Sequence, residues 1–210
     1  TAALGLLALA TAGAAEFDSQ IDALLARMTV PEKVGQLTQI GTAPGGGDHR
    51  PEHELLVEQG LIGSLINIHG AAKTNAVQRL AVEKSRLGIP VLFAYDLIHG
   101  YRTIFPVPLA EAASWDPALA EETAALAAAE ATAAGLRWTY APMVDIARDP
   151  RWGRVVEGSG EDPYLGSVMA AARVRGYQGN DLRDSLALIA SVKHFVGYGM
   201  TEGGLNWSPA

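Results

Sequence analysis

The sequence predicts an α/β fold in which about four parallel strands carry helices on their outer face. Short apolar stretches of strand length alternate along the chain with longer segments of helical character. The stretches are apolar throughout rather than alternately polar, which is typical of parallel strands buried on both faces. Two of the intervening helices have clear start signals, and parallel neighbours are joined by such helical crossovers.

The chain begins with an apolar run, residues 2–15, that ends in small residues. Ala12, Gly13 and Ala14 fit the A-x-A pattern of a signal-peptide cleavage site. The run is too short to span a bilayer. We therefore expect residues 1–15 to be the remnant of an export signal and the protein to be periplasmic or secreted. A buried or frayed N-terminal helix is the alternative.

Two helices are expected next. Apolar residues recur at helical spacing between Ile21 and Met28, and Thr29 with Glu32 forms a capping box for a second helix. The glycine-rich stretch 42–47 that follows fits neither of the common phosphate-binding patterns. The sequence therefore gives no support for nucleotide binding.

A pair of histidines raises the question of a metal site. His49 and His53 are four residues apart, a spacing that can place two imidazoles on one helical face. Pro51 lies between them and marks a helix start, so His49 is expected to precede the helix. A solvated polar loop is the favoured interpretation, and the absence of cysteine excludes thiolate ligands. We predict no metal and no cofactor.

The rest of the chain repeats a strand and helix plan. A helix over residues 72–87 is ended by Gly88, and an alanine-rich helix from Pro117 ends at Gly135. Asp-Pro pairs at 116–117 and 162–163 cap two helices, because the carboxylate accepts from free N–H groups and proline fits the first turn. The four strands are predicted over residues 65–68, 91–95, 138–144 and 188–193.

Composition narrows the class of partner. The 210 residues are 49% hydrophobic and 19% charged and carry a formal net charge of −7, with no basic run. Such a surface argues against binding to nucleic acid or anionic membranes. A neutral or polar small molecule is the expected partner.

A charged loop follows the third predicted strand. Residues 147–162 hold arginines and carboxylates around Trp152 and three glycines. A loop of this composition on a rigid strand is typical of a polar ligand site. A surface loop of salt bridges is the alternative, because arginine and acidic clusters are often structural.

Polar side chains also follow the other strands. Asp96 comes after the second strand, Arg154 lies in the charged loop, and Lys193 and His194 end the fourth. The carboxyl ends of parallel strands share one edge, so these four residues are expected to converge there. The alternatives are that Asp96 caps a turn, that Arg154 pairs with Glu157, and that the Lys-His pair is structural.

In these segments the chain resembles glycoside hydrolase family 3, in particular the periplasmic β-glucosidases of bacteria. The resemblance extends over nearly all of residues 22–204. It is carried by MTVPEKVGQL (28–37), SRLGIPVLFAYDLIHG (85–100), APMVDIARDPRWGRVVEGSGEDPYL (141–165) and SVKHFVGYGMTEGG (191–204).

The resemblance implies that the strands are the first half of a (β/α)8 TIM-type barrel. It also implies that Asp96, Arg154, Lys193 and His194 hold the hydroxyls of the sugar being cleaved. This is chemically sensible, because a carboxylate can accept from adjacent hydroxyls while Arg, Lys and His donate, and charge-assisted hydrogen bonds of this kind are strong. The expected activity is hydrolysis of terminal β-linked glucosyl residues from β-glucosides or oligosaccharides. The family's hexosaminidase branch carries Pro-Gly-His-Gly after Lys-His-Phe, and this chain does not, so a glucosidase is favoured while xylosidase specificity stays open.

The resemblance also exposes a gap. A retaining glycosidase needs two carboxyl groups, a nucleophile and an acid/base. In the family the nucleophile lies in a Ser-Asp-aromatic motif, and this chain contains no Ser-Asp dipeptide. We therefore expect both catalytic carboxylates beyond residue 210, and do not assign them to Glu157, Glu161 or Asp162.

The family pattern breaks after Gly204, so residues 16–210 are expected to be the N-terminal part of an incomplete barrel domain. Four strands do not close a barrel, and open edges expose strand backbone and apolar surface. We therefore expect marginal stability and possible self-association through the exposed edges. The alternative function is a non-catalytic, sugar-binding or self-associating half-barrel.

Overall fold

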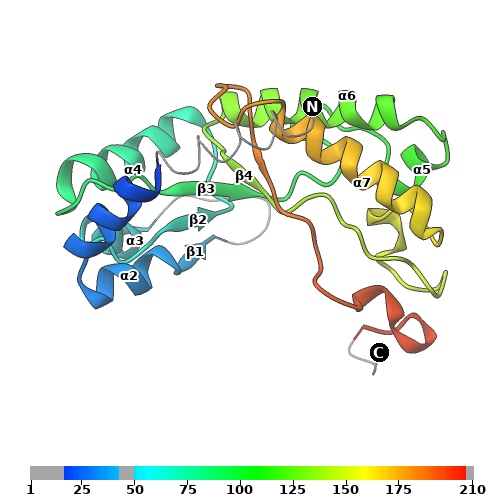
Figure 1. Cartoon of the computed structure of the whole chain (residues 1–210), viewed down its shortest axis with the longest axis horizontal. Helices are drawn as coiled ribbons and strands as arrows, with labels where there is room; N and C mark the ends of the chain where they lie inside the picture. Colours follow the sequence, from blue (N-terminus) through cyan, green and yellow to red (C-terminus); the bar gives the residue numbers. More distant parts are fainter. Residues whose placement is uncertain (1–16, 43–49, 207–210) are drawn as a thin grey trace, which may run out of the picture.

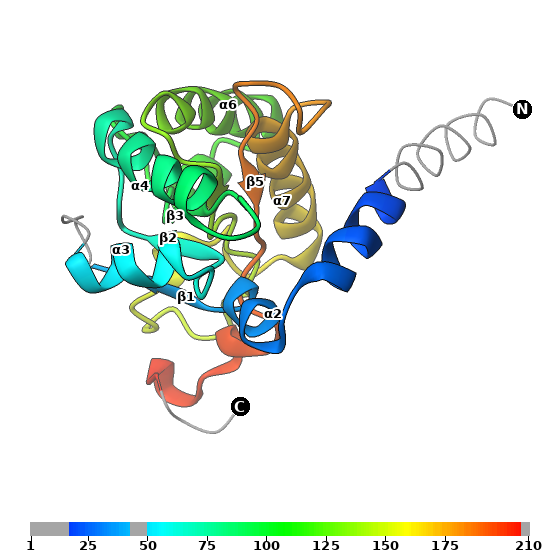
Figure 2. The same cartoon turned by 90° about the vertical axis from the view of Figure 1, so that its left-hand side faces the viewer.

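The computed structural model describes residues 17–42 and 50–206, and its centre is a parallel sheet. Within these residues the sheet has five strands in the order β1-β2-β3-β4-β5, with every neighbouring pair parallel. Figure 1 labels β1 to β4, and Figure 2 labels β5. The strands are β1 (Gln39–Gly41), β2 (Ser64–Ile66), β3 (Leu92–Tyr95), β4 (Trp138–Thr139) and β5 (Ile189–Ala190). This sequential parallel order confirms the predicted α/β class.

Helices cover one side of this sheet. After a helix over residues 17–27 the described helices are α2 (Val30–Gln36), α3 (Pro51–Glu58), α4 (Ala71–Lys84), α5 (Pro108–Ala112), α6 (Pro117–Ala133) and α7 (Pro163–Gln178). Figure 2 shows α3, α4, α6 and α7 in an arc around the outside of the strands. The arrangement is that of an open, partly built β/α barrel.

The strand prediction was incomplete in one respect. β1 was not expected, because its three residues contain a single large apolar side chain, Ile40. It belongs to the sheet through pairing with β2, in which Gln39 lies opposite Ser64. The other four strands lie within or next to the predicted ranges but are shorter.

The helix starts follow the sequence signals. Thr29 Oγ1 accepts from the Glu32 amide while the Glu32 carboxylate accepts from the Thr29 amide, which completes the capping box. Asp116 and Asp162 each accept from two amides in the first turn of α6 and α7. Gly135 has a φ of 87° just after α6, a conformation that favours glycine and ends the helix there.

The core lies between the sheet and the helices. Leu65 and Phe93 of the strands are buried in one apolar cluster with side chains of α4 and α6. α6 packs closely on α7 because Gly176 has no side chain: a Cβ there would lie 2.3 Å from the Glu121 carbonyl oxygen. The buried alanines of α6 permit the same close approach.

The opposite face of the sheet is only partly covered by the described residues. Leu92 on this face is 40% exposed. A short polar chain crosses it, in which Tyr140 donates to Gln39 over 2.5 Å and Gln39 donates to Ser64 over 3.0 Å. No described strand pairs with the outer side of β1 or β5.

Some predictions fall outside the described residues. These are the signal remnant at residues 1–15, most of the glycine-rich stretch 42–47, and His49. His53 lies in the first turn of α3, where its Nδ1 accepts from the Arg50 amide over 3.3 Å. Within the described ranges, no group of three or more possible metal ligands occurs, and no helix has the length and apolar character needed to cross a membrane.

Candidate functional site

The carboxyl ends of β3 and β5 bring an acid and a base together. Asp96 directly follows β3, and Lys193 lies three residues after β5. Lys193 Nζ donates to Asp96 Oδ1 over 2.6 Å. The Lys193 backbone is held by the segment after β4, because its carbonyl accepts from Val144 over 2.7 Å and its amide donates to Pro142 over 3.1 Å. The carboxylate is half exposed and faces solvent beside the ammonium group.

His194 is oriented by a buried carboxylate. Asp145 Oδ2 accepts from the His194 amide over 3.0 Å and lies 2.8 Å from its Nδ1. The Asp145 side chain is 2% exposed. Because a carboxylate can only accept, the His194 Nδ1 that faces it carries the proton and donates to it. In the neutral ring this leaves Nε2 as an acceptor. Asp145 therefore fixes both the direction and the tautomer of His194.

Arg154 lies beside this imidazole. It precedes the short 3₁₀ helix η1 (Val155–Glu157), and its Nε and Nη2 donate to Glu157 over 2.5 and 2.8 Å. Its Nη1 is 3.4 Å from His194 Nε2, and its guanidinium carbon is 5.3 Å from the centre of the Tyr198 ring. Nη1 of Arg154 thus faces the site, while the hydrogen bonds from Nε and Nη2 to Glu157 hold the side chain in place.

The ion pair between Arg154 and Glu157 stabilises the charged form of both side chains. Burial alone raises the pKa of the Glu157 carboxyl, but the hydrogen bonds and the positive charge of Arg154 outweigh that effect, so the pKa lies below its usual value. Hydrogen bonds to Glu157 raise the pKa of Arg154 further. Both side chains are therefore ionised at neutral pH.

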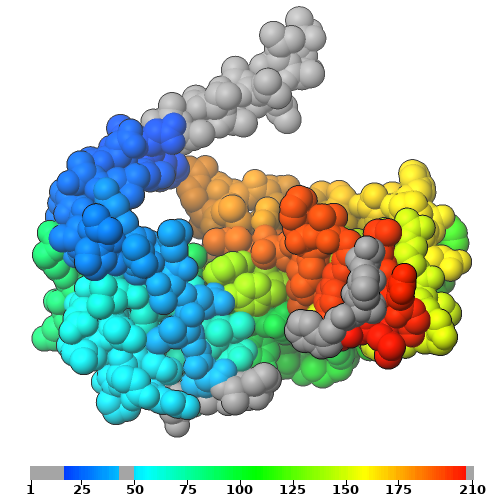
Figure 3. All heavy atoms as spheres, turned by 90° about the horizontal axis from the view of Figure 1, so that it is seen from below, coloured from blue at the N-terminus to red at the C-terminus, as the bar shows by residue number. Residues whose placement is uncertain are grey.

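Trp152 anchors the loop that carries Arg154. Its side chain is 1% exposed and packs with Met143 and Tyr198. Its indole Nε1 donates to Asn206 Oδ1 over 2.7 Å, which ties the loop to the end of the described chain. Figure 3 shows the segment after β5, in orange to red, lying on the surface next to the yellow-green loop after β4.

The structure thus brings the four predicted residues into one cluster. Asp96 contacts Lys193, the next residue is His194, and His194 faces Arg154. The alternative pairing of Arg154 with Glu157 also exists, and it orients the arginine without using all its donors.

Sequence reasoning missed two members of this cluster, Asp145 and Tyr198. Asp145 carries a signal that could have identified it, since it is a lone acid in the apolar run Met143–Ile146. Tyr198 has no such signal. It belongs to the 3₁₀ helix η2 (Tyr198–Met200) and packs edge-on against His194, with ring centres 4.8 Å apart.

A groove of about 290 Å³ adjoins the cluster. His194 and Asp145 line it together with apolar side chains that include Val192 and Met200. Phe195 at its border is 99% exposed. The polar cluster is therefore continuous with an apolar surface on the β5 side of the sheet.

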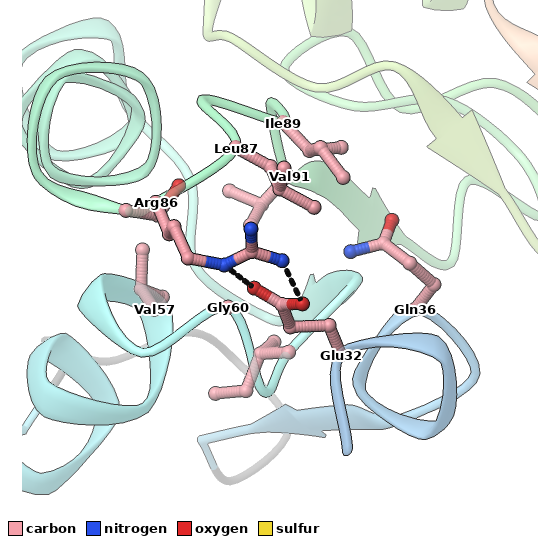
Figure 4. Close-up of a pocket in the computed structure, with 10 residues that line it drawn as sticks. Glu32, Gln36, Val57, Gly60, Arg86, Leu87, Ile89 and Val91 are labelled. Carbon is pink, nitrogen blue, oxygen red and sulfur yellow. Dashed lines mark hydrogen bonds and ion pairs between the residues drawn. The ribbon is translucent and has the colours of Figure 1, made fainter. Parts of the chain in front are cut away.

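A second cavity has a structural role. It holds about 10 Å³ and lies beside Arg86, whose Nε and Nη2 donate to Glu32 over 2.9 and 2.5 Å (Figure 4). Arg86 also donates to the Arg27 carbonyl. The hydrogen bonds from Arg86 and Thr29 lower the pKa of Glu32 to about 2. This ion pair links α2 to the segment before β3 and leaves no room for a ligand.

The fold and the site together define the class of protein. Parallel β/α units in sequential order, with charged side chains gathered at the strand ends, form the first part of a TIM-type barrel with a polar ligand site. Residues 29–210 match the model of the glycosyl hydrolase family 3 N terminal domain, so the chain belongs to this family.

Curated relatives are glycosidases. The chain is 40% identical over 193 residues to a periplasmic beta-glucosidase of Salmonella typhimurium, a match that covers 91% of this chain and 25% of that protein. It is 31% identical over 203 residues to a beta-xylosidase of Formosa agariphila, covering 91% of this chain and 22% of that one. The chain thus spans about a quarter of the length of these relatives.

Solved structures agree. The fold matches a beta-glucosidase from Listeria innocua with a TM-score of 0.81 and 38% identity, over 90% of this chain and 28% of that chain. The complex of that protein with glucose matches with a TM-score of 0.80. The family and the barrel fold expected from the sequence are confirmed.

Proposed function

We propose that this chain supplies the sugar-binding half of a retaining β-glucosidase site, in an enzyme that removes terminal β-linked glucosyl residues from β-glucosides or oligosaccharides. The observation that carries this proposal is the contact between Asp96 and Lys193 beside His194 and Arg154 at the strand ends. The printed names of the relatives, which are beta-glucosidases and beta-xylosidases, support the substrate class.

The cluster suits a ring of adjacent hydroxyl groups. The half-exposed Asp96 carboxylate can accept from two neighbouring hydroxyls, because an ionised carboxylate has about four acceptor positions. Lys193 Nζ and Arg154 Nη1 can donate to hydroxyl oxygens, and His194 offers its Nε2. Charge-assisted hydrogen bonds of this kind are about twice as strong as neutral ones.

The chemistry requires two further carboxyl groups. Retaining hydrolysis needs a nucleophile and an acid/base about 5 Å apart on either side of the bond that breaks. In the described cluster Glu157 is occupied by Arg154, and Asp145 by His194. We therefore propose that both catalytic carboxyl groups lie outside this chain, which alone binds sugar without turnover.

Titration of the 210-residue chain with glucose, followed by amide NMR, tests the proposal. Small ligands gain roughly 0.3 kcal/mol or more per non-hydrogen atom, so we expect a dissociation constant on the order of millimolar. Lys193→Met is expected to weaken binding about ten-fold, because one charge-assisted hydrogen bond is lost. Lys84→Met is the matched control, since Lys84 lies exposed in the last turn of α4.

Two results would contradict the proposal. Equal affinities of the two lysine variants would show that glucose binds elsewhere. Hydrolysis of an aryl β-glucoside by the purified chain would show that it contains its own nucleophile, and would refute the assignment of the catalytic carboxyl groups to another part of the protein.

We also propose that the protein is exported. The apolar run at residues 2–15 with its A-x-A pattern supports this, as does the relative named a periplasmic beta-glucosidase. Expression in a bacterial host followed by N-terminal sequencing of the periplasmic fraction tests it. Cleavage after Ala14 or Ala15 is the expected result, and an uncleaved cytoplasmic product would contradict it.

A third proposal concerns self-association of the isolated chain. β5 has no described strand on its outer side, and the exposed Phe195 and Val196 follow it. Exposed strand edges and apolar patches favour contact between copies. We expect sedimentation to show concentration-dependent association, whereas a monomer at all concentrations would contradict this proposal.

A further inference from the structure

The backbone immediately behind Asp96 is held from two sides by buried side chains. The Leu97 amide donates to Thr139 Oγ1 of β4 over 3.1 Å. The Leu97 carbonyl accepts from the Tyr177 hydroxyl over 2.5 Å, and the next carbonyl, that of Ile98, accepts from Arg173 Nη1 over 3.1 Å. Three backbone polar groups of Leu97 and Ile98 thus have side-chain partners.

The two side chains that donate to the Leu97 and Ile98 carbonyls come from one helix. Arg173 and Tyr177 are four residues apart in α7 and so lie on the same face, which is turned to the sheet. They are 5% and 2% exposed. Burial raises the pKa of Tyr177 to about 12, so its hydroxyl keeps its proton and remains a donor at neutral pH.

Arg173 is itself oriented by a second buried group. Its Nη2 donates to Glu111 Oε2, and the other oxygen of Glu111 accepts from Thr123 over 2.6 Å. Glu111 lies in α5, Thr123 in α6 and Arg173 in α7, so the network joins three helices to the segment after β3.

Stability is a weak explanation for such a network. A buried ion pair often contributes no more stability than apolar residues of the same size would, because both charges lose their hydration. What this network adds is a fixed position for the backbone. The Asp96 carboxylate is 48% exposed and accepts from Lys193, so its position depends largely on the main chain that carries it.

We propose that Tyr177, Arg173 and Thr139 are positioning residues that fix the backbone after Asp96 and thereby place its carboxylate against Lys193 and the sugar. The inference rests on the proposed function, because it concerns the sugar-binding role of Asp96. None of the three contacts the sugar cluster itself, so they act through Leu97 and Ile98.

Tyr177→Phe tests this inference, because it removes one hydroxyl and keeps the buried ring. Tyr101→Phe is the matched control: its hydroxyl lies 2.8 Å from His69 Nδ1 and does not hold the segment behind Asp96. We expect Tyr177→Phe to move the carbon-13 NMR signal of the Asp96 carboxyl and to weaken glucose binding three- to ten-fold. Tyr101→Phe is expected to change neither.

A folded Tyr177→Phe chain with an unchanged Asp96 signal and unchanged affinity would overturn the inference. If that variant does not fold, Thr139→Val provides the same test from β4, since it removes the acceptor of the Leu97 amide. If the wild-type chain fails to bind glucose, the proposed function fails, but the Asp96 signal still decides the inference. A shift in that signal supports positioning, and no shift contradicts it.

Discussion

The contact between Asp145 and His194 makes the substitution Asp145→Asn informative. Both hydrogen bonds from His194 end on the same oxygen, Oδ2, over 3.0 and 2.8 Å. Asparagine can place its oxygen there, so both bonds persist but lose their charge. Hydrogen bonds to charged groups contribute about 1.5–3 kcal/mol and neutral ones about half as much. The free energy of unfolding should therefore fall by roughly 1.5–3 kcal/mol.

Urea unfolding followed by circular dichroism measures this loss. Asp184→Asn is the control, because Asp184 is exposed and accepts from the Leu186 amide, which asparagine can also do. A change within about 0.5 kcal/mol is expected for it. Nitrogen-15 NMR of the His194 ring reports the second effect, since a neutral asparagine oxygen favours the Nδ1–H tautomer less strongly than the carboxylate does, so the share of the Nε2–H tautomer should rise.

An Asp145→Asn variant that is as stable as the wild type, and whose His194 ring keeps the same tautomer, would refute this role of Asp145. In that case Asp145 would not orient the imidazole, and the orientation of His194 would depend on its backbone alone. Loss of stability without a change of tautomer would refute only the second half of the argument.

Three further predictions follow from other contacts. Arg86 lowers the pKa of Glu32 from 4.5 to about 2, so the stability that the ionised Glu32 contributes is full above pH 4.5 and is lost as the pH falls toward 2. Glu32→Gln should flatten this part of a plot of the urea midpoint against pH. An unchanged plot would contradict the contribution of Glu32. Gly176→Ala should destabilise the chain by about 1–3 kcal/mol in thermal unfolding, because the added Cβ would clash with α6. Gly153→Ala should not, because a Cβ at that position would have no atom within 4 Å. Equal effects of the two substitutions would contradict the close packing of α7 on α6. Phe195→Ser should reduce self-association in sedimentation, since this side chain is 99% exposed, and an unaltered profile would place the contact elsewhere.

Local signals in the sequence were sufficient for most of the fold. Proline after a capping aspartate located the starts of α6 and α7, and apolar stretches located four strands. β1 was missed because a strand of three residues with one large apolar side chain has no periodicity to detect. Its place in the sheet depends on pairing with β2, which is a tertiary contact.

The candidate site shows the same division. Asp96, Arg154, Lys193 and His194 were predicted because polar residues at the ends of parallel strands converge at one edge. Their supporting contacts were not predictable, since they join residues distant in the chain. Asp145 lies 49 positions from His194, and no local pattern indicates such a pair.

The buried network behind Asp96 is further from sequence reasoning still. Arg173 and Glu111 are 62 positions apart and lie in different helices. In the sequence each looks like an ordinary charged residue of a solvated helix face. Only the packing of α5, α6 and α7 against one another reveals that both are buried.

A crystal structure of the chain grown with saturating glucose would show whether the sugar binds to the cluster around Asp96 and Lys193. We expect one sugar at the carboxyl ends of β3 and β5, with two adjacent hydroxyls donating to Asp96 and with Lys193 and Arg154 within hydrogen-bonding distance. A sugar bound elsewhere, or Asp96 still facing solvent in a crystal whose chain is saturated by solution titration, would contradict it.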